Sequence, residues 1–211
     1  MNDASDLAMY NLVKRISDVM LSFFSICLLF PLFVLLGLLI KVDSKGPVIY
    51  KGIRSGLHSA PFEIYKFRTM VYNAESIGGF VTSENDGRVT RVGRVFRKYK
   101  LDELPQLFNV LQGSMSIVGP RPEVPLYTNM YTGEEMLILT VRPGITDFSS
   151  MYFVQLASVV GSSDDKIQFD RNIQDVLRTK NKLRIKYVKE RSFSTDIQII
   201  IKTFVKLFKS F

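Results

Sequence analysis

The sequence contains no tryptophan, one cysteine and one histidine among its 211 residues. Because Cys27 has no second cysteine to pair with, an intramolecular disulfide and a cysteine metal cluster are both excluded, and a reducing compartment fits the chain. His58 lies in a polar stretch typical of a turn, which argues against zinc hydrolysis and against Ser-His chemistry.

Acidic residues are outnumbered: 20 Asp and Glu stand against 28 Lys and Arg, giving a formal net charge of +8 at pH 7. This charge and the pI of about 9.5 indicate an anionic partner. Nucleic acid, acidic lipid headgroups and phosphorylated substrates would each satisfy it. The position of charge along the chain separates these alternatives.

Charge is missing altogether from Val19 to Ile40. About 20 apolar residues suffice to cross a bilayer, and no signal-peptide cleavage site follows the run. Pro31 is expected to kink or break a helix here. Because basic residues stand on both sides, the orientation rule does not favour a crossing, and spanning and re-entrant helices both stay open. Lys14 and Arg15 precede the run, and Lys41 and Lys45 follow it. The residues expected at the membrane interface are Lys14, Arg15 and Asp18, together with Pro31.

After this run, short strand patterns alternate with helical ones, and no internal repeat or low-complexity tract is present. Residues 47–51 and 62–67 read as two strands joined by a loop that holds Gly52, which predicts a β-hairpin. We therefore expect an α+β fold, with a membrane-inserted helix in residues 1–45 and a membrane-associated domain in residues 46–211.

Two helices are expected in the middle of the chain. Arginines recur every third residue from Arg88 to Arg97, and on a helix they would form a cationic stripe. That stripe could be a solvated face, a headgroup patch or a phosphate site. The next helix is expected to end at Gly113. Its predicted buried side consists of Leu104, Leu107, Phe108 and Leu111.

Three further helical segments follow. Thr132 and Glu135 have the spacing of a capping box, so a helix should run from there to about Val141. Residues 164–189 have a helical pattern with a charged surface. Residues 195–211 form a basic amphipathic pattern, suited to an acidic membrane surface or to docking on the protein's own core.

Asp102 and Glu103 are adjacent carboxylates between the basic stretch and a helical segment. Adjacent helical residues point about 100° apart, so the two cannot duplicate each other's role. Pro105 fits a first helical turn, which would place Asp102 at or near the cap and favour its ionised form. Such a carboxylate could act as a nucleophile or a magnesium ligand. Simple helix capping is the alternative, and the more common one.

Taken together, these motifs resemble the small monotopic polyprenol-phosphate phosphoglycosyl transferases of the bacterial sugar transferase family. The resemblance covers nearly the whole chain. Its motifs are Lys14-Arg15 with Asp18, the apolar segment with Pro31, Gly46-Pro47, Lys66 to Met70, Arg91 to Arg97, residues 101–122 with their Gly119-Pro120-Arg121-Pro122 turn, and Arg142 to Thr146.

The resemblance implies transfer of a phospho-sugar from a UDP-sugar to a polyprenol phosphate such as undecaprenyl phosphate, with release of UMP. It makes Asp102 the nucleophile that forms a covalent phosphosugar intermediate. Glu103 is implied to hold Mg²⁺ with it or to position the substrates. The remaining implied substrate-binding or turn-fixing residues are Lys66, Arg68, Arg97, Pro120 and Arg121.

The resemblance also implies a re-entrant helix bent at Pro31, phospholipid contacts, and a catalytic domain on the cytoplasmic face of the bacterial inner membrane. The chain departs from the family pattern in residues 147–151, which begin with Asp147. It also departs from the pattern at Arg184, where many relatives have an acidic residue. The sugar, the glycan pathway and self-association into a homo-oligomer are left open. A nucleic-acid-binding module is the rival function, but it leaves the charge-free run unexplained.

Overall fold

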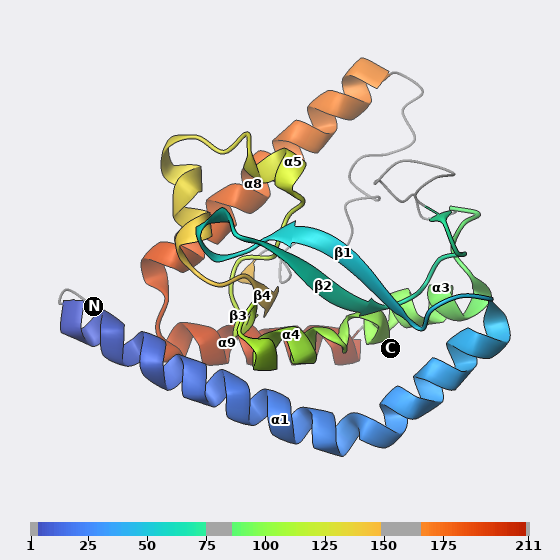
Figure 1. Ribbon diagram of the computed structural model, residues 1–211. Coiled ribbons are helices and arrows are strands. Elements are labelled where there is room, and N and C mark those ends of the chain that lie inside the picture. The colour runs from blue at the N-terminus through green and yellow to red at the C-terminus, as the bar shows by residue number, and fades with distance from the viewer. Residues whose placement is uncertain (1–3, 75–85, 149–165, 210–211) are drawn as a thin grey trace.

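The computed structural model describes residues 4–74, 86–148 and 166–209 (Figure 1). Its helices and strands are mixed, as an α+β fold requires, and two small two-stranded sheets carry the strands. The elements are α1 (Ala4–Asp43), β1 (Ile49–Ser55), η1 (Leu57–Ser59), β2 (Pro61–Phe67), α3 (Arg91–Lys98), η2 (Leu101–Glu103), α4 (Gln106–Gln112), β3 (Ser116–Val118), α5 (Pro125–Thr128), η3 (Gly133–Thr140), β4 (Gly144–Thr146), α8 (Lys166–Glu190) and α9 (Phe193–Lys209).

Helix α1 continues through Pro31 without a break. Figure 1 shows its two arms meeting at an angle beneath the rest of the chain. A proline inside a helix removes one backbone hydrogen bond and bends the axis, so the expected kink is present. At about 1.5 Å per residue, the 40 residues of α1 extend about 60 Å, twice the hydrocarbon thickness of a bilayer.

The apolar surface of α1 is largely uncovered. Its most apolar part has a mean hydropathy of 2.8, and only 11% of it is buried by the rest of the protein. Leu28, for example, is 80% exposed. The helix is thus long and apolar enough to cross a membrane. One side near its end packs into the core, where Leu36 and Ile40 meet Phe67 and Phe96.

Strands β1 and β2 form the predicted hairpin, antiparallel and in register from Ile49–Phe67 to Ser55–Pro61. The first strand is longer than expected, because Gly52 lies inside it and not in the loop. The ring of Tyr50 lies over Gly52, so a Cβ at this position would require the Tyr50 side chain to move. Strands β3 and β4 pair in parallel, Ser116 with Gly144 and Val118 with Thr146.

The predicted arginine stripe is only partly helical. Helix α3 begins after Thr90, whose side chain accepts a hydrogen bond from the Gly93 amide at 3.0 Å. Arg88 therefore precedes the helix, and its Nη2 pairs instead with Asp86 at 2.6 Å. Within the helix Arg94 is exposed, whereas Arg97 is turned inwards.

Helix α4 ends at Gly113 in a left-handed conformation, with φ of 93°, as predicted. The expected buried side was wrong: Gln106, Asn109 and Val110 are buried, and Phe108 is 39% exposed. The polar face is buried because the Asn109 amide completes the edge of the hairpin. Asn109 Oδ1 accepts from the Tyr65 N–H at 2.8 Å, and Nδ2 donates to the Glu63 carbonyl at 2.7 Å.

The structure contains helical segments at all three positions predicted for the last part of the chain. The predicted capping box of Thr132 and Glu135 is present, with the Thr132 N–H donating to Glu135 at 3.3 Å, although the helix that follows is of the tighter 3₁₀ type. Residues 164 and 165 of the predicted charged helix lie outside the described residues. Helix α9 docks on the core through the fully buried Ile199, as one alternative predicted, while Ile201 and Phe204 are exposed and a membrane-surface role for them stays a prediction.

Candidate functional site

The carboxylate pair lies in a tight turn between two helices. Helix α3 ends, Lys100 adopts a left-handed conformation with φ of 57°, and the short η2 turn then carries Asp102 and Glu103. The cap of α4 is Pro105, so the expectation that Asp102 would cap this helix is wrong.

Glu103 is held by two cations from other parts of the chain. Arg121 Nη1 donates to Oε2 at 3.0 Å, and Arg121 Nη2 makes a second, shorter contact with Oε1, which gives a two-pronged pair. Lys66 Nζ, from β2, lies 3.1 Å from Oε1. Burial alone would raise the pKa of Glu103, but Arg121 and Lys66 outweigh it and hold the pKa well below its usual range.

Asp102 is in a contrasting environment. It is 8% exposed, and its Oδ1 has no hydrogen-bond partner among the described residues. Burial first, and the negative charge of Glu103 second, raise the pKa of Asp102 above its ordinary value. The expectation that a helix terminus would favour its ionised form is therefore contradicted, because the residue is buried and is not the cap. An uncommitted, desolvated carboxylate oxygen is well suited to nucleophilic attack.

The segment that presents Arg121 is fixed by close backbone contacts. Gly119 N–H donates to the Thr146 carbonyl and Gly144 N–H to the Pro120 carbonyl, each at 3.0 Å. A Cβ on Gly144 would collide with the backbone of Gly119, so the two chains can approach this closely only with glycine at that position. Pro120 is buried in this contact, which agrees with its predicted turn-fixing role.

The structure separates two of the other predicted site residues. Arg97 Nε donates to Thr69 at 2.8 Å, and burial lowers the pKa of Arg97 while the charge of Asp102 opposes this, so Arg97 belongs to the electrostatic surroundings of the pair. The guanidinium of Arg68 instead donates to the carbonyls of Ser44 and Lys45, at 2.7 and 2.8 Å. Arg68 therefore secures the chain that leaves α1, and a substrate contact from it stays a prediction.

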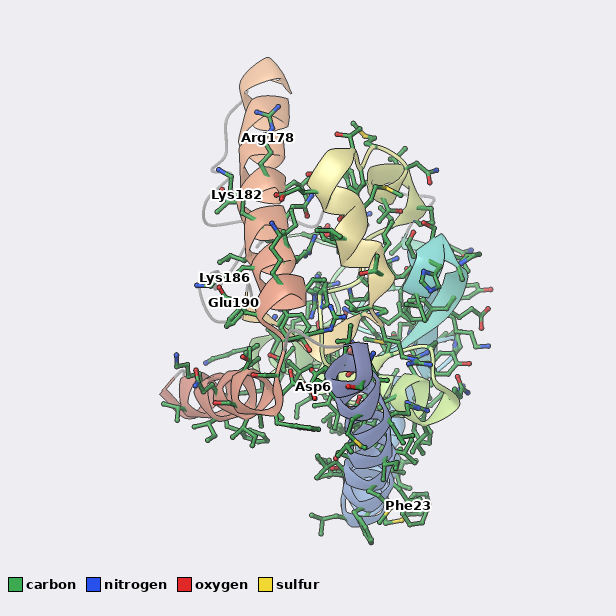
Figure 2. The ribbon with its side chains drawn as sticks, turned by 90° about the vertical axis from the view of Figure 1, so that its left-hand side faces the viewer. Asp6, Phe23, Arg178, Lys182, Lys186 and Glu190 are labelled. Carbon is green, nitrogen blue, oxygen red and sulfur yellow. The ribbon has the colours of Figure 1, made fainter. Side chains whose placement is uncertain are left out.

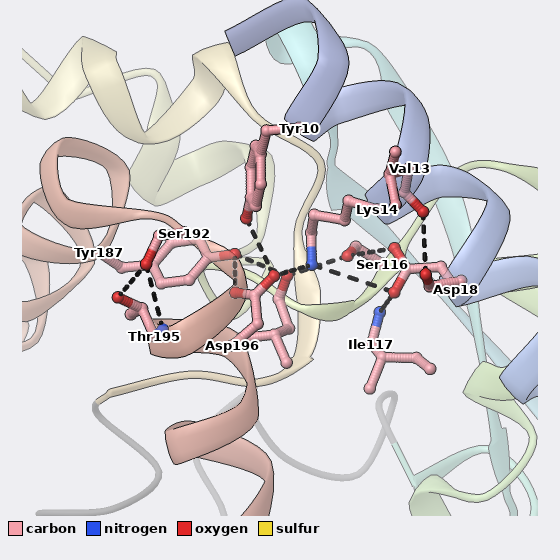
Figure 3. A network of polar contacts seen from close by, with 12 residues as sticks. Tyr10, Val13, Lys14, Asp18, Ser116, Ile117, Tyr187, Ser192, Thr195 and Asp196 are labelled. Carbon is pink, nitrogen blue, oxygen red and sulfur yellow. Dashed lines mark hydrogen bonds and ion pairs between the residues drawn. The ribbon is translucent and has the colours of Figure 1, made fainter. Parts of the chain in front are cut away.

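The residues expected at the membrane interface contact the protein itself. Figure 3 shows Lys14 Nζ on Asp196 at 2.8 Å and Ser116 donating to Asp18 at 2.6 Å. Tyr187 also donates to Asp196, at 2.9 Å. Arg15 donates to the Val110 and Leu111 carbonyls at the end of α4, at 2.7 and 3.1 Å. These residues thus join the first arm of α1 to α4, β3 and α9, a role that simple headgroup contact does not describe.

Sequence reasoning missed a second buried ionic group, on α8. Arg184 is 1% exposed and pairs with Glu123 at 2.7 Å. One turn earlier, burial lowers the pKa of Lys180, and the positive charges of Arg184 and Arg121 lower it further although Glu123 opposes them. The sequence analysis had singled out both Asp147 and Arg184, but nothing in the sequence showed that they lie close together.

The fold and site define an α+β protein with a long apolar N-terminal helix. Its buried pair of carboxylates lies among cations from separate elements. A family model described as bacterial sugar transferase matches residues 9–210. The chain belongs to the bacterial sugar transferase family.

Named relatives agree with this assignment. The chain is 36% identical over 197 residues to a UDP-N-acetylgalactosamine-undecaprenyl-phosphate N-acetylgalactosaminephosphotransferase of Aeromonas hydrophila, covering 92% of this chain and 43% of the relative. It is 34% identical over 196 residues to a UDP-glucose:undecaprenyl-phosphate glucose-1-phosphate transferase of Caulobacter vibrioides, covering 92% of this chain and 68% of the relative. A UDP-glucose:undecaprenyl-phosphate glucose-1-phosphate transferase of Escherichia coli is 34% identical over 203 residues, and the match covers 95% of this chain and 40% of the relative. The chain thus spans less than half the length of two of these relatives.

Proposed function

We propose that this protein transfers a phospho-sugar from a UDP-sugar to undecaprenyl phosphate or a similar polyprenol phosphate and releases UMP, so that it starts the assembly of a bacterial glycan. The names of the relatives support the substrate class, and they differ in the sugar. The observation that carries the proposal is the contrast within the carboxylate pair. Glu103 has cationic partners at both oxygens, while Asp102 keeps a buried oxygen that has no hydrogen-bond partner among the residues that the structure describes.

The reaction proceeds in two steps at one phosphorus atom. An Asp102 carboxylate oxygen attacks the sugar-bearing phosphorus, a new P–O bond forms to Asp102, and the P–O bond to UMP breaks, with the electron pair leaving on UMP. An oxygen of the polyprenol phosphate then attacks the same phosphorus and displaces Asp102. The products are a polyprenol diphosphate sugar and the regenerated carboxylate.

The cations of the site make this approach electrostatically feasible. Lys66 and Arg121 balance the charges of Asp102 and Glu103, so an incoming diphosphate does not meet a net negative surface. Phosphoryl transfer depends mainly on positioning and charge neutralisation, which fixed cations supply. Glu103 serves as the anchor that fixes both cations beside Asp102.

The same pair fits a magnesium ion. Among the described residues no group of three or more His, Cys, Asp or Glu could hold a metal. Magnesium commonly binds one or two carboxylates and completes its coordination with water and substrate phosphates. Asp102 Oδ1, which accepts no hydrogen bond within the described part of the chain, would provide a protein ligand, with Glu103 beside it. When bound, the ion would neutralise charge on the diphosphate.

The proposal includes a re-entrant α1, with the domain on the cytoplasmic face of the inner membrane, where nucleotide sugars are made. Support comes from both flanks of the apolar run, which contact the same domain. Before the run, Lys14 and Asp18 bind Asp196 and Ser116; after it, Asp43 accepts a hydrogen bond from the Val92 N–H at 3.1 Å. A helix that crossed the membrane once would place these flanks on opposite sides.

The test measures UMP release by the full chain in lipid discs containing undecaprenyl phosphate, with UDP-glucose and UDP-N-acetylgalactosamine among the donors. We expect release with one donor, loss by about 10³-fold or more in Asp102→Asn, and loss of about 10²-fold in Glu103→Gln. Chelation of magnesium should stop the reaction. Asp6→Asn, an exposed carboxylate on α1, is the matched control. Near-normal turnover by Asp102→Asn would refute the assigned nucleophile.

A further inference from the structure

Arg184 is a fully buried cation far from the carboxylate pair in the sequence. Its side chain is 1% exposed, and its guanidinium donates to Glu123 at 2.7 Å and to Asn181 at 3.0 Å. Its Nε also lies 4.0 Å from Asp147 Oδ2. A buried arginine is costly unless its charge is matched, and here two carboxylates match it.

Both carboxylates lie next to the segment that carries Arg121. Asp147, directly after β4, accepts a hydrogen bond on Oδ2 from the Arg121 backbone N–H at 3.3 Å. Glu123 is two residues beyond Arg121, and its own carbonyl accepts from the Ser55 N–H at 2.9 Å. Arg184 thus connects the two sides of the Arg121 segment to each other and to α8.

The result is a chain of alternating charges that leads to the reactive pair. Arg184 lies beside Asp147, Asp147 binds the backbone of Arg121, and the Arg121 side chain binds Glu103. Glu103 raises the pKa of Arg121 most, and Asp147 adds to this effect. Burial would lower the pKa of Arg184, but Glu123, Tyr131 and Asp147 outweigh it and raise the pKa.

We infer that Arg184 is a positioning residue for phospho-sugar transfer: with Asp147 and Glu123 it fixes the backbone of Arg121, so that the Arg121 guanidinium stays on Glu103 next to Asp102. The inference rests on the proposed function and deepens it. Asp147 and Arg184, 4.0 Å apart, then form one interdependent unit. An arginine that only docked α8 would contribute to stability without acting through Arg121.

A double-mutant cycle on UMP release separates these roles. We expect Arg184→Met to lower kcat by about 10- to 100-fold, the usual cost of losing a group that orients an active-site residue. In an Arg121→Met background the same change should cause no further loss, because the residue through which it acts is already gone. Arg184→Lys keeps the charge but loses the planar set of guanidinium N–H donors, so it should recover part of the rate of UMP release. Arg178→Met, exposed on the same helix, is the control (Figure 2).

The outcome that overturns the inference is an equal fold-loss from Arg184→Met in both backgrounds. A second readout does not need turnover: NMR signals of the Arg121 guanidinium should be slow to exchange in the parent chain and in Arg178→Met, and fast in Arg184→Met. If Arg184→Met does not fold, Asp147→Asn, which keeps the shape of the side chain, should show the same change. Unchanged Arg121 signals in a folded variant would also overturn the inference. Absence of UMP release by the parent chain would instead refute the proposed function, and the NMR comparison would still decide the positioning role.

Discussion

At the scale of single residues, Asp102 and Glu103 have different surroundings, which suit them to different roles. The sequence alone predicted that two adjacent carboxylates could not share one role, and the structure agrees. It could not predict which residue would be free, because the partners of Glu103 lie 37 and 18 residues away in the chain. It also mistook the ionisation of Asp102, since burial depends on the whole fold and the expectation rested on a local cap.

The raised pKa of Asp102 gives a prediction with a definite sign. Because burial and the charge of Glu103 raise it above the ordinary 3.8, Asp102 should keep its proton to a higher pH than an exposed aspartate does. As the pH falls through this raised pKa, the nucleophile is lost. Carbon NMR of the carboxyl groups in metal-free protein should show one aspartate titrating late, and Asp102→Asn should remove that signal.

Glu103→Gln provides the internal control for this titration. It removes one of the two causes of the shift, so the pKa of Asp102 should move down while burial keeps it above the ordinary value. A pKa of Asp102 at or below the ordinary value in the parent chain would contradict the description of the site.

At the scale of elements, helix α1 shows most clearly what a sequence pattern can and cannot establish. The charge-free run and Pro31 predicted a long apolar helix with a bend, and both are present. The sequence pattern did not separate spanning from re-entrant forms, and the re-entrant form stays a proposal that rests on the contacts of both flanks with the same domain. Helix α4 gives the opposite lesson: its apolar pattern predicted the wrong buried face, because the hairpin needs the amide of Asn109.

The re-entrant form of α1 can be tested by cysteine labelling in intact cells. In a Cys27→Ser background, cysteines are placed before the run at Asp6 and after it at His58, both exposed positions. If both flanks face the cytoplasm, neither cysteine should react with a membrane-impermeant maleimide until the cells are permeabilised. Labelling of position 6 but not of position 58 in intact cells would favour a single crossing.

At the scale of the whole molecule, most of the exposed large apolar side chains of the described residues lie on two helices. Exposed apolar side chains lie on α1 and α9, for example Leu28 and Phe204. Figure 2 shows Arg178 and Lys186 along α8, and Phe23 of α1 at the far end of the molecule. This arrangement suits a protein with one side in lipid.

The central claim is that Asp102 becomes bonded to phosphorus in each cycle. The most direct measurement incubates the chain with a UDP-sugar labelled in the sugar-bearing phosphate, without polyprenol phosphate, and locates the label by mass spectrometry of the quenched peptides. The account predicts a phospho-sugar adduct on Asp102 that disappears when polyprenol phosphate is added. UMP release at the normal rate with no label on Asp102, or with label on another residue, would contradict it.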